Sequence, residues 1–119
     1  MTFKYPVYIP SLSGNEKAYV NDCLDTNWIS SKGKYVNKFE EKFSHFTGIK
    51  SSAAVCNGTV ALHLALEALG IGEGDEVIVP TLTYIASVNA ISYTGAKPIF
   101  VDSNKDTWQM EPSDIVSKI

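Results

Sequence analysis

The fold of this chain is decided by residues 53–101, which read AAVCNGTVALHLALEALGIGEGDEVIVPTLTYIASVNAISYTGAKPIFV. Three short apolar segments of this stretch are typical of buried strands: Ala53–Cys56, Glu76–Val79 and Pro98–Val101. The two segments between them, Val60–Leu69 and Tyr84–Tyr93, have the length and periodicity of helices. This alternation predicts a mostly parallel α/β sheet with helices on both faces. Because Val60–Leu69 is apolar nearly all round, we expect that helix to be buried on several sides.

Two further helices are predicted on the N-terminal side of this stretch. Ser13 and Glu16 have capping-box spacing, in which Ser13 caps a helix that runs to about Thr26 and Glu16 reaches back. Aromatic and apolar residues then recur at helical spacing over residues 35–46, and Gly48 is placed to end that helix.

On the C-terminal side, Pro112 follows Glu111 and suits the first turn of a final helix. The chain ends at Ile119, only about two turns further on. Since a domain rarely stops at such a point, we expect that the chain is truncated.

Composition excludes several classes of function. The net charge of −3 and the pI of about 5.3 argue against a nucleic-acid-binding protein, which typically has a basic surface. All ten basic residues are lysines, so the planar fork of arginine is absent. No apolar run is long enough to cross a bilayer, which argues against a membrane protein. Cys23 and Cys56 are isolated and have no C-x-x-C spacing, which indicates a reducing, cytoplasmic setting.

The turn Asn57-Gly58-Thr59 is the most informative candidate site. It joins a predicted strand to a predicted helix, at the edge of the sheet where α/β proteins bind ligands. Gly58 permits close approach of a ligand, and Thr59 offers an N–H and a hydroxyl at a helix N-terminus, which favours a phosphate. The alternative is a plain helix cap. Tyr84, just past the next strand, could stack on a flat ring or simply pack at the start of its helix.

Two other motifs give weaker evidence for a functional site. Asp102–Asp106 begins like a calcium loop but has Thr107 at the sixth position and Ser113 at the twelfth. His63 lies one helical turn before Glu67 and is better explained as a packed or paired histidine than as a metal ligand. We therefore expect no metal site.

Six segments in order resemble one known family: Trp28–Gly33, Phe39-Glu40, Asn57–Leu62, Gly74–Pro80, Thr83–Ser87 and Phe100–Asp102. Together they resemble the N-terminal part of the DegT/DnrJ/EryC1/StrS sugar aminotransferases. The resemblance covers nearly the whole chain. It implies the N-terminal part of the three-layer α/β/α large domain of a pyridoxal-phosphate (PLP) transferase. Residues 1–33 would form an N-terminal arm, a helix and a substrate-side loop, and residues 34–119 an incomplete PLP-binding domain.

The resemblance also implies residue roles. Gly58 and Thr59 would hold the cofactor phosphate, and Tyr84 would stack on the pyridine ring. Trp28, Ser30 and Ser31 would line the substrate side. No catalytic residue is assigned, because the family's cofactor-carrying lysine and the acidic residue facing the pyridine nitrogen lie downstream of this chain, and none of its ten lysines matches.

The activity implied is transfer of an amino group, with glutamate as donor, to a GDP-linked 4-keto-6-deoxy sugar for surface polysaccharide synthesis. The full-length enzyme would be a cytoplasmic homodimer, and this chain alone would be inactive. Two alternatives remain open. One is a small non-catalytic α/β module that binds a phosphate-bearing ligand at Gly58-Thr59, and the other is a relative that uses PLP for sugar dehydration.

Overall fold

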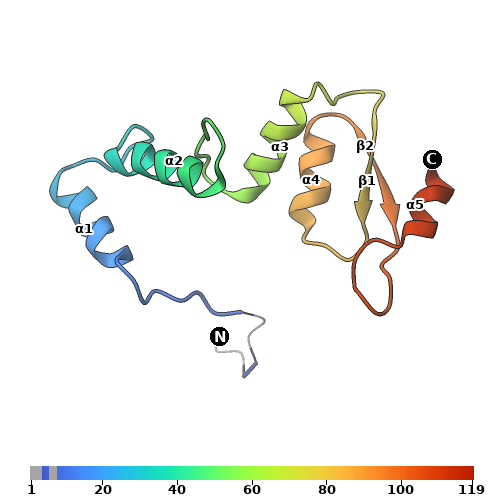
Figure 1. Ribbon diagram of the computed structural model, residues 1–119, viewed down its shortest axis with the longest axis horizontal. Coiled ribbons are helices and arrows are strands. Elements are labelled where there is room, and N and C mark those ends of the chain that lie inside the picture. The colour runs from blue at the N-terminus through green and yellow to red at the C-terminus, as the bar shows by residue number, and fades with distance from the viewer. Residues whose placement is uncertain (1–3, 6–7) are drawn as a thin grey trace. The chain divides into compact units, whose positions relative to one another are not determined.

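The structure is a computed structural model that describes residues 4–5 and 8–119. It divides into two compact units, residues 1–54 and residues 55–119 (Figure 1). The sequence predicts a division after Gly33 according to function, whereas these units are defined by their internal contacts. The functional division therefore stays a prediction.

The first unit contains helices α1 (Glu16–Asp25) and α2 (Lys34–Thr47). The end of α2 confirms the expected stop signal, since Gly48 has the left-handed φ of 73° that glycine adopts without strain. The capping box expected at Ser13 is wrong. The helix starts at Glu16 after Asn15, and Glu16 Oε2 instead accepts a hydrogen bond from the Gly14 N–H at 2.9 Å. With Glu16 as the first helical residue, Ser13 lies too far back to act as the cap.

The strand expected at Ala53–Cys56 does not form. Within the described residues, the sheet contains only the two strands of the second unit. The Ala54 N–H donates instead to Glu40 Oε1 at 2.8 Å, and the Ser52 hydroxyl donates to the Glu40 carbonyl at 2.7 Å. A strand exists through its ladder of hydrogen bonds, so an apolar segment with no neighbouring strand is left irregular.

The second unit is an α/β arrangement whose elements are α3 (Gly58–Ala68), β1 (Glu76–Pro80), α4 (Ile85–Tyr93), β2 (Lys97–Val101) and α5 (Pro112–Lys118). The two strands pair in parallel from Glu76 opposite Lys97 to Pro80 opposite Val101. Helix α4 packs on both strands, and α5 packs on β2 on the other side of the strand pair (Figure 1). The predicted α/β class with helices on both sides is confirmed.

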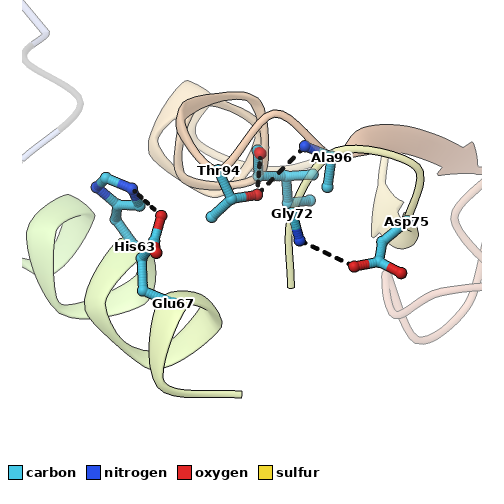
Figure 2. A network of polar contacts seen from close by, with 7 residues as sticks. His63, Glu67, Gly72, Asp75, Thr94 and Ala96 are labelled. Atoms are coloured by element: carbon cyan, nitrogen blue, oxygen red, sulfur yellow. Dashed lines mark hydrogen bonds and ion pairs between the residues drawn. The ribbon is translucent and has the colours of Figure 1, made fainter. Parts of the chain in front are cut away.

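Loops at the amino ends of the strands are fixed by local hydrogen bonds. Asp75 Oδ2 accepts from the Gly72 N–H at 2.9 Å, and the Ala96 N–H donates to Thr94 Oγ1 at 3.3 Å (Figure 2). Gly95, with φ of 84°, closes α4 as its sequence position predicts. These contacts stabilise the turns that lead into β1 and β2.

The core is small and lies around the strand pair. Its buried residues are Val79, Ala90, Ile91, Ala96 and Val101. The expectation that the helix at Val60–Leu69 is buried on several sides is wrong, because α3 has no buried residue. Helix α4 is the element against which α3 packs, so Leu62 and Leu64 on its other sides remain 45% and 50% exposed.

Candidate functional site

Two helix N-termini and two strand ends lie toward the same end of the second unit. Strands β1 and β2 point toward this end, and α3 and α4 both begin there (Figure 1). Parallel strands in α/β proteins present their ligand sites beyond their carboxyl ends. The geometry therefore brings Gly58 and Thr59, at the start of α3, to the same end as Tyr84, at the start of α4.

Asn57 is the residue that caps α3. Its backbone is extended, with φ of −166° and ψ of 171°, and its Oδ1 accepts from the Val60 N–H at 3.0 Å. Its carbonyl accepts from the Ala61 N–H at 3.1 Å. In the part of the chain that the structure describes, the N–H groups of Gly58 and Thr59 donate to no protein acceptor. Two unpaired donors at the positive end of a helix dipole favour an anion.

Gly58 is not required by packing or by backbone conformation. A Cβ built at this position would meet no atom within 4 Å, and the residue does not have a left-handed φ. The space beside it is open to an approaching ligand. The Thr59 hydroxyl also has no hydrogen-bond partner among residues 8–119. Two N–H groups and one O–H group, all donors, fit a phosphate dianion. Because Asn57 performs the capping, Thr59 is not needed for it.

Tyr84 occupies the N-cap position of α4 and is 69% exposed. Its backbone is extended, with φ of −65° and ψ of 143°, while Thr83 Oγ1 and Ser87 Oγ lie 3.0 Å apart in the first turn. An exposed aromatic ring at this end of the unit is placed where it could stack on a flat ligand. The stacking role stays a prediction.

The predicted substrate-side residues lie in the first unit, on the loop between α1 and α2. The Trp28 N–H donates to the Cys23 carbonyl at 2.9 Å, and the Gly33 N–H donates to the Ser30 carbonyl at 3.3 Å. The Ser30 hydroxyl accepts from the Lys32 N–H at 3.3 Å. Backbone hydrogen bonds thus hold the loop at both ends, to the last turn of α1 on one side and within the loop on the other.

A groove of about 760 Å³ opens beside this loop within the first unit. Trp28 and Ser30 line it together with aromatic residues of the two helices, including Tyr19 and Phe39, whereas Ser31 is not among its lining residues. The structure therefore brings two of the three predicted substrate-side residues to one surface.

Sequence reasoning missed a charged cluster at the base of the same loop. Lys34 and Asp22 form an ion pair. The Lys34 ammonium holds the pKa of the Asp22 carboxyl below its usual range, and Asp22 in turn raises the pKa of Lys34. Burial, followed by the contact with Asp22, raises the pKa of Tyr35. The two charges are twelve positions apart, so no local periodicity could have revealed the pair.

The remaining candidates have structural roles. His63 Nε2 lies 3.2 Å from Glu67 Oε1, which confirms the predicted pairing (Figure 2). In the loop after β2, Asn104 Oδ1 accepts from the N–H groups of Asp106 and Thr107 at 3.0 and 3.1 Å, so this side chain stabilises the loop backbone.

No group of side chains that could hold a metal ion occurs among the described residues. None of the described helices has the length and apolar character needed to span a membrane.

This α/β unit, with unpaired donors at a helix N-terminus beyond the ends of parallel strands, has the architecture of the N-terminal part of the PLP transferase fold. The chain belongs to the DegT/DnrJ/EryC1/StrS aminotransferase family, whose model matches residues 10–119. The resemblance seen in the sequence is confirmed.

Two curated relatives carry the same name. The chain is 70% identical over 114 residues to a GDP-perosamine synthase of Escherichia coli O157:H7, covering 96% of this chain and 31% of that protein. It is 54% identical over 114 residues, with the same two coverages of 96% and 31%, to a GDP-perosamine synthase of Vibrio cholerae. The chain thus spans about a third of the length of these relatives.

A solved structure gives the same result for the fold. The PMP form of a putative sugar aminotransferase of Streptococcus pneumoniae superposes with a TM-score of 0.85 at 34% identity, covering 98% of this chain and 29% of that one. The PLP form of that protein gives the same TM-score of 0.85.

Proposed function

We propose that this chain contributes the phosphate-binding and substrate-side segments of a PLP-dependent aminotransferase. The reaction transfers an amino group to the 4-keto carbon of a GDP-linked 4-keto-6-deoxy sugar. The observation that carries the proposal is the start of α3, where Gly58 and Thr59 present unpaired donors beside open space. The name GDP-perosamine synthase, borne by relatives 70% and 54% identical, supports the substrate class.

The residues of this chain bind and orient rather than carry the chemistry. When bound, PLP supplies the electron sink for the reaction. The N–H groups of Gly58 and Thr59 and the Thr59 hydroxyl would hold its phosphate, which fixes the cofactor at the ends of the strands. Tyr84 would stack on its ring. Trp28, Ser30 and Ser31 would face the sugar nucleotide.

Three finer proposals accompany this one. Glutamate is the amino donor, which rests on the family resemblance. The full-length enzyme is a cytoplasmic homodimer: the cytoplasmic setting agrees with the free cysteines Cys23 and Cys56, and the homodimer rests on the family resemblance. The product serves surface polysaccharide synthesis.

A chimera tests the proposal. This chain would replace the matching 114-residue part of the Escherichia coli relative, which is 70% identical and therefore supplies a compatible remainder. The purified chimera should bind PLP, measured by absorbance, and should form an amino sugar from glutamate and the GDP-linked keto sugar. The parent relative is the positive control.

Two results would contradict the proposal. A folded chimera that binds phosphate compounds but not PLP would indicate the small phosphate-binding module. A folded chimera that binds PLP but forms no amino sugar would contradict the substrate-side role, because the relative supplies the rest of the enzyme.

A further inference from the structure

The ends of the substrate-side loop are joined by charge. Asp22 lies on α1, three residues before its end, and Lys34 is the first residue of α2, so their ion pair spans the whole loop at residues 26–33. Such a contact between the two helix ends restricts how far the loop can spread.

The residues around Asp22 and Lys34 favour the ion pair between them. Asp22 Oδ2 is shielded from solvent, which reduces screening of its attraction to Lys34. The Lys34 ammonium also lies 5.3 Å from the centre of the Tyr35 ring. That ring in turn packs against Tyr19, with centroids 4.9 Å apart. The Lys34 ammonium, and to a smaller extent the Tyr35 hydroxyl, hold the pKa of the Asp22 carboxyl below its usual range.

The loop itself is compact and leaves little room for adjustment. Gly33 is buried, and a Cβ built there would lie 3.4 Å from the Trp28 carbonyl oxygen. Asn27 adopts a left-handed φ of 59° as the chain leaves α1. A movement of either helix end is therefore transmitted to Trp28 and Ser30, because the loop between them is closed by its own hydrogen bonds.

We propose that Asp22 and Lys34 are positioning residues that hold the loop carrying Trp28 and Ser30 in the orientation that receives the sugar nucleotide. This inference rests on the proposed function. In this proposal the pair acts on substrate binding through the loop.

The expected effect is moderate and selective. Lys34 and Asp22 are 57% and 38% exposed, and ion pairs at such positions change binding by about two- to fivefold. In the chimera, Asp22→Asn and Lys34→Met should each raise the KM for the sugar nucleotide by about that factor. They should leave kcat, the KM for glutamate and the dissociation constant of PLP unchanged, because only the loop is displaced.

Charge reversal and a matched control separate positioning from general stability. Asp22→Lys combined with Lys34→Asp restores an ion pair between the same helix ends, and it should recover at least half of the lost affinity. Asp25→Asn removes a carboxylate from the end of the same helix, where no ion pair is present among the described residues. It should leave the KM unchanged. Calorimetry with the GDP-linked keto sugar provides a readout that does not depend on turnover.

Several outcomes would overturn the inference while leaving the proposed function intact. These are an unchanged KM in Asp22→Asn, an equal effect of Asp25→Asn, or a fall in kcat without a change in KM. A charge-reversed double variant that folds but binds no better than the single variants would also overturn it. An inactive chimera with native residues at both positions, by contrast, would count against the proposed function itself.

Discussion

Replacing Thr59 by valine should weaken PLP binding without disturbing α3. The change removes one hydroxyl and keeps the shape of the side chain. In the described residues this hydroxyl contacts no protein acceptor, and Asn57 provides the cap, so no protein hydrogen bond is lost. Threonine and valine also have similar helix propensities. Any change in PLP affinity would therefore reflect the loss of a contact between the Thr59 hydroxyl and PLP.

The magnitude follows from the donor set. The phosphate keeps the two N–H donors of Gly58 and Thr59 and loses one O–H donor. A hydrogen bond to a charged group contributes about 1.5–3 kcal/mol, so the dissociation constant of PLP should rise roughly ten- to a hundredfold. Thr59→Ser retains the hydroxyl and should bind PLP nearly as tightly as the parent.

The assay is an absorbance titration of the cofactor-free chimera with PLP. A second titration uses pyridoxal, which lacks the phosphate and provides a matched control. Thr59→Val should bind pyridoxal as well as the parent does, because the deleted contact involves only the phosphate. An unchanged dissociation constant for PLP, or an equal loss for PLP and pyridoxal, would show that Thr59 does not contact the phosphate.

Three other predictions concern the 119-residue chain and its last helix. The chain by itself should form no amino sugar from PLP, glutamate and the keto sugar, because none of its lysines matches the family's cofactor-carrying lysine; turnover above background would refute this. The chain by itself should also associate and melt without one cooperative transition, since only five apolar residues are buried among the described ones and α3 is largely uncovered. Size-exclusion chromatography and urea melting test this, and a soluble monomer with a single transition would contradict it. Finally, the Asp102 N–H, which donates to Asp114 Oδ2 at 2.8 Å, holds the pKa of Asp114 below its ordinary 3.8. A lowered folded-state pKa means that the stabilisation is fully present above that ordinary value and is lost as the pH falls through the lowered one. In the chimera, hydrogen-exchange protection at Asp102 should follow this profile, whereas Asp114→Asn should show no such pH dependence.

Features set by nearest neighbours could be predicted from the sequence. Gly48 and Gly95 end their helices because a left-handed residue is accessible to glycine wherever the rest of the chain lies. Pro112 begins α5 with Glu111 as its cap for an equally local reason. The start of α3 was also readable, since the donors of a helix N-terminus follow from the residues that form it. The prediction that Gly58 and Thr59 form an anion site rests on these local features, and it stays a prediction.

Features that depend on distant partners were decided only by the tertiary structure. The apolar segment Ala53–Cys56 reads as a strand, but in the described part of the chain no strand lies beside it, and Glu40 accepts from the Ala54 N–H instead. The apolar helix α3 was expected to be buried, yet burial requires covering elements and α4 covers one side. The pairing of Asp22 with Lys34 depends on how two helices are joined, because charges twelve residues apart meet only when the intervening loop folds back.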